Sequence, residues 1–116
     1  MTQSVVSDKS LAFAKRISWY YVYLKKQGET VMSKQLLRSG TSIGANIAES
    51  KAAQSEADFI NKLSIALKEA NETKYWLVLL HESDTISDDE FHSIENDINT
   101  IIGTLIIIIK KKKGLQ

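Results

Sequence analysis

The chain has 116 residues, a formal net charge of +1, and neither Cys nor Pro. That length supports one hydrophobic core, so we expect a single domain over residues 1–116. The lack of Cys excludes disulfides and thiolate metal sites and fits a cytoplasmic protein, and the lack of Pro favours long, uninterrupted helices.

No segment has the pattern of a membrane span or a secretory signal. The most apolar run, residues 101–109, is about half of the roughly 20 residues that a membrane-spanning helix needs. The first ten residues have neither the basic start nor the apolar core of a signal peptide. We therefore expect no membrane partner.

Apolar side chains recur at steps of three and four over about residues 10–27, which predicts an amphipathic helix. They are Phe13, Ile17, Tyr20, Tyr21 and Leu24. Trp19 and Tyr23 fall off this stripe, where they are placed to cover a second contact. Residues 1–8 precede the helix as a short polar N-terminal arm.

A second helix is predicted from about Ser33, and two glycines interrupt it. Gly40 and Gly44 do not form a phosphate-binding loop, because the spacing is wrong and no Lys follows. On a helical wheel both glycines lie inside the apolar arc, beside Ile and Leu. We expect them to let a neighbouring helix approach closely.

The opposite side of the same helix carries a polar stripe of Arg38, Ser42, Asn46 and Glu49. The stripe has two interpretations. It is an ordinary solvated face, or it is a contact to another subunit or a ligand, with Arg38 donating and Glu49 accepting hydrogen bonds.

A third helix is predicted to begin at Ser55, where Ser55 and Asp58 have the spacing of a capping box. Its apolar residues then form a heptad seam typical of helix packing. The seam comprises Phe59, Leu63, Ala66, Ala70, Thr73, Leu77 and Leu80. A second stripe follows Ile60, Leu67, Trp76 and Leu79, which fits either the centre of a bundle or an oligomer contact.

The fourth helix is predicted to begin after Ser87, with Glu90 completing a second capping box. Its seam comprises Phe91, Ile94, Ile98, Ile101, Leu105 and Ile108. Gly103 costs this helix about 1 kcal/mol relative to Ala unless a neighbour comes close. A lysine-rich tail follows over residues 110–116.

Short connections join these four helices, so consecutive helices should be antiparallel neighbours. The predicted fold is therefore all-α, a single antiparallel up-down-up-down four-helix bundle.

No catalytic constellation stands out in the sequence. A di-iron bundle needs two Glu-x-x-His motifs, whereas neither His81 nor His92 follows a Glu at that spacing, and Asp89 with His92 is the nearest approach. We expect no enzymatic activity, no metal, no cofactor and no small-molecule substrate.

Basic residues near aromatic ones give an alternative, since such mixtures can clamp single-stranded nucleic acid. The candidate contacts are Lys15, Arg16, Lys25, Lys26, Lys110, Lys111, Lys112 and Lys113. Charge is segregated along the chain, with +4 over residues 1–50, −7 over 51–109 and +4 over 110–113. Such segregation suits self-association or a charged partner.

The stretch "LLRSGTSIGANIAES", followed by "EADFINKLSIALKEANETKYWLVLL", resembles the 23S rRNA-intervening-sequence proteins. Arg38, Thr41, Ser42 and the run Asn46 to Glu49 match the family motif, whereas Ser50 replaces its usual Gly. The resemblance implies a four-helix bundle that assembles into a homopentamer and has no established enzymatic activity.

The genes of such proteins often lie within ribosomal RNA genes, which implies a link to nucleic acid. A similar bundle, the accessory variability protein of diversity-generating retroelements, is a basic pentamer that engages nucleic acid and a reverse transcriptase. The near-neutral charge of this chain departs from that relative. We therefore expect a homo-oligomeric interaction scaffold, with a nucleic-acid-binding accessory factor as the alternative.

Overall fold

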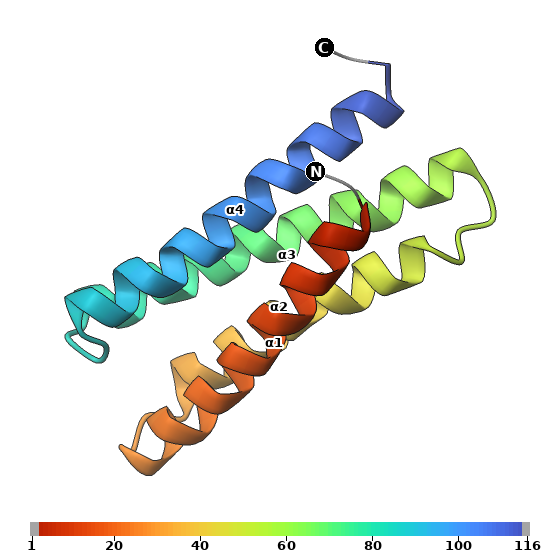
Figure 1. Ribbon diagram of the computed structural model, residues 1–116. Helices are drawn as coiled ribbons and strands as arrows, with labels where there is room; N and C mark the ends of the chain where they lie inside the picture. Colours follow the sequence, from red (N-terminus) through yellow and green to blue (C-terminus); the bar gives the residue numbers. More distant parts are fainter. Residues whose placement is uncertain (1–2, 115–116) are drawn as a thin grey trace.

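A computed structural model describes residues 3–114, which form four α-helices in this order: α1 Gln3–Lys26, α2 Val31–Ser50, α3 Glu56–Glu82 and α4 Asp88–Lys112. Figure 1 shows each helix running antiparallel to the one before it. The α1–α2 and α3–α4 turns lie at one end of the molecule, and the α2–α3 turn and both chain ends lie toward the other. The all-α, up-down-up-down bundle predicted from the sequence is confirmed.

The apolar seams predicted for α3 and α4 meet in one core along a molecule that measures 44 × 24 × 19 Å. In α3 the whole predicted seam is buried except Phe59, which is half-buried near the first turn. Ile60, Leu67 and Trp76 of the second stripe are partly buried against the same core. The bundle itself therefore accounts for these three residues.

The first helix begins earlier than predicted. α1 starts at Gln3, so the polar arm expected at residues 1–8 is wrong over residues 3–8, and residues 1–2 lie outside the described part. Val6 is fully buried and continues the core stripe of α1 by one more turn. Ser10 is also buried, and its hydroxyl donates to the Ser7 carbonyl at 2.9 Å. This local bond lets a polar residue occupy a core position.

The lysine-rich tail is helical as far as Lys112, and residues 115–116 lie outside the described part. Lys112 Nζ lies 3.2 Å from Glu56 Oε1 and 5.1 Å from the centre of the Phe59 ring. The end of α4 is thereby held against the start of α3. None of the four helices in residues 3–114 carries an apolar stretch long enough to cross a membrane.

Side chains cap three of the helices at their N-terminal ends. The Ser55 and Ser87 hydroxyls accept hydrogen bonds from the backbone N–H groups of Asp58 and Glu90, at 3.0 and 3.2 Å. Both predicted starts are confirmed.

The start of α2 has a cap that the sequence pattern did not predict. The Glu29 carboxylate accepts hydrogen bonds from three successive backbone N–H groups, at 3.2, 2.9 and 2.7 Å. Thr30, at the usual capping position, makes no such bond. One carboxylate thus satisfies donors that would otherwise be unpaired and places a negative charge at the positive end of the helix.

The two glycines of α2 lie where that helix meets α1. A Cβ atom added at Gly40 would stand 3.1 Å from Ile17 Cγ2, and one at Gly44 would stand 3.3 Å from Ser10 Oγ. At Gly103 of α4, by contrast, no atom of the described chain comes within 4 Å of such a Cβ.

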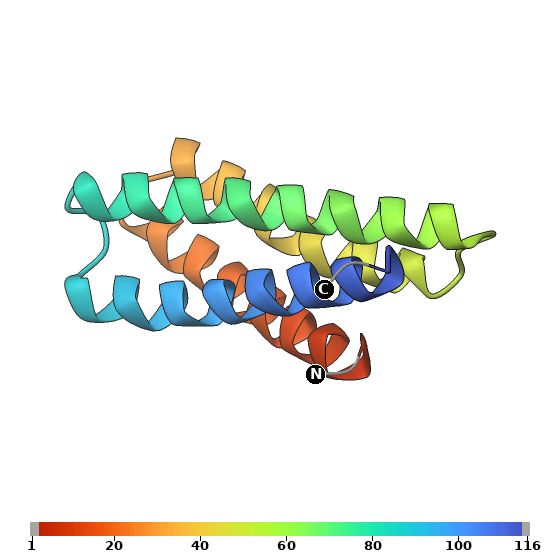
Figure 2. The same ribbon diagram turned by 90° about the horizontal axis from the view of Figure 1, so that it is seen from above.

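α1 packs closely on α2 but meets α4 only over a short stretch. In Figure 2, α1 crosses the α3–α4 pair at an angle. The α1–α4 side is therefore the open side of the bundle.

We predict that Gly40→Ala lowers the free energy of unfolding by about 1 kcal/mol, because the new Cβ would lie 3.1 Å from Ile17, which is fully buried and has to shift to accommodate it. Gly103→Ala is the matched control, and it should raise the free energy of unfolding by about 0.5–1 kcal/mol through helix propensity. Urea unfolding followed by circular dichroism measures both. Equal effects of the two substitutions would contradict the close packing at Gly40.

We also predict that Glu29→Gln destabilises the protein in a pH-dependent way. Burial raises the pKa of Glu29, but hydrogen bonds from the backbone of Met32 and Ser33 lower it, and the net result lies below its ordinary value of 4.5. A lowered pKa gives stability that is present above the unfolded value and is lost as pH falls through the folded value.

The loss in Glu29→Gln should therefore be about 1 kcal/mol at pH 7 and should become smaller as the pH falls toward the lowered pKa of Glu29. Denaturant unfolding at pH 7 and at about pH 3 measures this. The same loss at both pH values would show that charge contributes nothing to the cap.

Candidate functional site

The polar stripe predicted on α2 lies along the border between α2 and α3. Its four residues share one side of α2, as the helical wheel predicted. The side chains of Arg38, Asn46 and Glu49 are hydrogen-bonded or ion-paired to groups of the chain, and the hydroxyl of the fourth residue, Ser42, accepts a bond from Asn46. We refer to this border, with Arg38, Glu69 and Glu72 at its centre, as the α2–α3 polar seam.

Arg38 forms the centre of the seam. Its side chain is half-exposed, and it donates a hydrogen bond to Glu72 Oε2 and lies 3.3 Å from Glu69 Oε2. Trp76 Nε1 donates to the same Glu72 oxygen at 3.1 Å. The hydrogen bond from Trp76, followed by that from Arg38, holds the pKa of Glu72 below its usual range.

Glu69 is the more deeply placed carboxylate, with 13% of its side chain exposed. Its Oε2 atom is buried and has no hydrogen bond within residues 3–114, so the nearby Arg38 charge is its main compensation. Closer to the core than Arg38 and Glu69, the buried Thr73 hydroxyl donates a hydrogen bond to the buried Ser39 hydroxyl at 3.0 Å. A polar connection between α2 and α3 thus runs from the surface into the core.

The remaining stripe residues are also held locally. Asn46 Nδ2 donates to the Ser42 carbonyl at 2.9 Å and contacts the Ser42 hydroxyl at 3.2 Å. Glu49 Oε1 lies 3.5 Å from Lys62 Nζ on α3. The two ends of the stripe, Arg38 and Glu49, therefore brace α2 against α3, a third role that neither interpretation of the sequence included, while the bonds between Asn46 and Ser42 stay within α2. The outer edge of Arg38 stays accessible.

The histidines lie near the α3–α4 turn. His81 Nε2 is 2.6 Å from Asp88 Oδ1, and a hydrogen bond from His81 holds the pKa of Asp88 below its ordinary value. His92 Nδ1 lies 3.9 Å from Glu95 Oε1. Across residues 3–114 no three His, Cys, Asp or Glu side chains gather in a way that could hold a metal ion.

The basic residues singled out in the sequence do not form one patch. Lys25 and Lys26 end α1 at one end of the bundle, whereas the lysines that end α4 lie at the other end. Arg16 faces α4 and lies 2.9 Å from Asp97 Oδ2 and 3.5 Å from Glu90 Oε2. Its charge is thereby neutralised within the chain.

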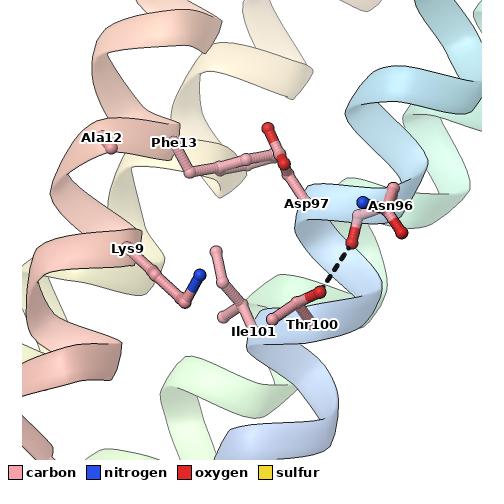
Figure 3. A pocket seen from close by; sticks show the side chains of 7 residues that line it. All are labelled: Lys9, Ala12, Phe13, Asn96, Asp97, Thr100 and Ile101. Carbon is pink, nitrogen blue, oxygen red and sulfur yellow. Dashed lines mark hydrogen bonds between the residues drawn. The ribbon is translucent and has the colours of Figure 1, made fainter.

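Between α1 and α4 lies a cleft of about 240 Å³. Figure 3 shows Lys9 and Phe13 of α1 facing Asn96, Asp97 and Thr100 of α4 across it. Thr100 Oγ1 donates to the Asn96 carbonyl at 3.0 Å. The floor of the cleft is apolar, because Phe13 and Ile101 belong to the core.

The outward side of α1 is exposed and rich in apolar side chains, and we call it the α1 outer face. Trp19 is 62% exposed, and its ring stacks on Tyr23 with 5.7 Å between centroids and 5° between planes. Exposed residues recur along this face at steps of three and four: Asp8, Leu11, Lys15, Trp19, Val22 and Lys26. The sequence signal was the position of Trp19 and Tyr23 off the core stripe.

Comparison with known proteins gives a family and a similar solved structure. The profile described as "23S rRNA-intervening sequence protein" matches residues 2–106. A crystal structure of a protein with unknown function from the S23 ribosomal protein family of Bacteroides thetaiotaomicron is 60% identical, with a TM-score of 0.93. The match covers 95% of this chain and 99% of that one. No curated protein matches the sequence.

We predict that Arg38→Ala lowers the free energy of unfolding by about 1–2 kcal/mol, because it leaves the largely buried Glu69 without its countercharge. Adding Glu69→Gln should recover part of that loss, whereas adding Glu49→Gln, at the far end of the stripe, should not. Chemical denaturation of these three variants and of the single variant Glu69→Gln gives the comparison. Full additivity of Arg38→Ala and Glu69→Gln would show that these two residues do not interact.

Proposed function

The chain belongs to the 23S rRNA-intervening sequence protein family, and we propose that it is a non-enzymatic protein that self-assembles, as a homopentameric ring, and serves as an interaction scaffold. The family and its solved relative carry no assigned activity. Assembly and scaffolding therefore depend on the surfaces of this chain.

The uncovered α1 outer face carries the proposal. Monomeric proteins rarely expose large contiguous apolar patches, and an apolar patch rimmed by polar residues marks an interaction site. Leu11 is 63% exposed and Val22 50% exposed on the same side as Trp19. Another protein surface would remove all of this area from water.

The polar seam supports a non-catalytic role. Its carboxylates face Arg38 or Trp76, and the pKa of Glu72 is lowered, so that Glu72 stays ionised and suits neither a general acid nor a base working near neutral pH. The seam fits a structural brace between two helices of a subunit.

A nucleic-acid-binding accessory factor is the second candidate, and one observation favours it. Lys15 and Lys26 are exposed on the α1 outer face, one turn before Trp19 and one turn after Val22, so a flat aromatic surface lies between two cations. This combination suits a stacked base with flanking phosphates. The two candidates use the same face and compete for it.

We predict that the wild-type protein is oligomeric in sedimentation equilibrium at micromolar concentration and that Trp19→Ser shifts it toward the monomer. The reason is the loss of the largest exposed apolar side chain of the face. Val31→Ser is the matched control, since Val31 is 75% exposed but belongs to α2. A monomeric wild type would refute the assembly.

The nucleic-acid candidate is tested with the wild-type protein and a single-stranded RNA over a salt series. Binding through phosphates predicts an affinity that falls steeply with salt, together with quenching of Trp19 fluorescence. Salt-independent or undetectable binding would exclude this candidate and leave the scaffold.

A further inference from the structure

A ring built from one repeated contact brings two different surfaces together, so the α1 outer face needs a distinct counterpart on the next copy. Resting on the proposed self-assembly, we propose that α1 of one copy packs antiparallel against the outward side of α4 of the next copy. This α4 outer face carries exposed residues at every seventh position, with two isoleucines between the last two of them. It comprises Asp89, Asn96, Gly103, Ile106, Ile107 and Lys110.

The charges on the two faces are ordered so that they complement each other. Along α1 the face begins with Asp8 and ends with Lys26, and along α4 it begins with Asp89 and ends with Lys110. An antiparallel alignment therefore opposes Asp8 to Lys110 and Lys26 to Asp89. The separations differ by about one helical turn, 18 residues between Asp8 and Lys26 and 21 between Asp89 and Lys110, or about 27 and 32 Å at the rise of an α-helix. With Asp8 opposite Lys110, the long Lys26 side chain therefore has to reach about one turn along α4 to meet Asp89.

These four charged side chains are exposed and form no ion pair within residues 3–114. Nearby cations form ion pairs within the subunit: Arg16 pairs with Asp97 of α4, and Lys112 pairs with Glu56. The unpaired charges thus lie on the outward sides of α1 and α4, where a second copy can reach them.

The same alignment brings apolar groups together. Leu11 follows Asp8 by three residues and Ile107 precedes Lys110 by three, so opposing the charges also opposes Leu11 to Ile107. Leu11 is 63% and Ile107 48% exposed. Four residues further on, Lys15 meets Gly103, where the space above the helix is open for its aliphatic stem.

The position of the two faces favours closure into a ring. α1 and α4 are neighbouring helices of the bundle, so their outer faces lie on adjacent corners rather than on opposite sides. Each added copy therefore turns relative to the last, and the chain of contacts closes after a small number of subunits.

Cysteine cross-linking tests the contact directly, because the chain has no Cys of its own. Leu11→Cys and Ile107→Cys proteins are purified separately, mixed, allowed to exchange subunits and oxidised. We expect a disulfide-linked dimer in the mixture and little in either protein alone, since a disulfide needs Cα atoms within about 7 Å. Leu11→Cys mixed with Val31→Cys is the control and should give no dimer.

Charge reversal gives an independent test. Lys26→Glu and Asp89→Lys should each lower the association constant at least tenfold, and the double variant should return to within about threefold of wild type, because the pair is restored with opposite sign. Lys34→Glu, an exposed lysine on α2, is the control and should change nothing.

The outcomes separate this contact from assembly in general. A monomeric wild type would refute the proposed self-assembly and this contact with it. Three results with an oligomeric wild type would overturn the α1–α4 contact and leave self-assembly standing. The first is that no cross-link forms in the mixture. The second is that cross-links form only between two copies of the Leu11→Cys protein. The third is that the association constant is unchanged in both charge-reversal variants.

Discussion

The close approach of α1 to α2 determines much of the remaining architecture. Because Gly40 has no side chain, Ile17 of α1 packs against the backbone of α2, and Gly44 repeats this contact at Ser10. α1 therefore packs mainly against α2 and contacts α4 only over a short stretch around Arg16. Two consequences follow: the α1–α4 side of the bundle is open, and Trp19 and Leu11 remain exposed on the outward side of α1.

α2 combines this thin apolar side with a polar side that fixes α3. Apolar seams alone allow neighbouring helices to slide by a turn, because one heptad layer resembles the next. The Arg38 pairing with Glu69 and Glu72 and the buried contact between Ser39 and Thr73 are available in one register only. The motif around Arg38 thus makes most of its contacts within the subunit. Only the exposed outer edge of the Arg38 side chain is accessible to a partner.

Sequence periodicity predicted the helices well, since the apolar seams and the serine caps are local patterns that can be recognised in the sequence itself. It misplaced the start of α1, because a buried Ser10 breaks the apolar stripe and is tolerated only through its bond to Ser7. It also missed the Glu29 cap, which lies one residue before the usual position. The partners of Arg38 were beyond its reach, because Glu69 and Glu72 are 31 and 34 residues away in the chain and only the packing of α3 brings them close.

The segregated charge of the chain has a simple origin in this arrangement. Several charges that face a neighbouring helix are paired inside the subunit, as Arg16, Arg38, Lys62 and Lys112 are. The outward faces of α1 and α4 retain unpaired charges in the same order along each helix, acidic first and basic last, so an antiparallel contact between copies makes them complementary. A net charge of +1 leaves little overall repulsion between copies. A near-neutral chain with complementary faces is suited to meeting copies of itself, whereas polyanion binding would favour a surplus of positive charge on one continuous surface. The balance of charge therefore supports a protein partner at the α1 outer face over nucleic acid.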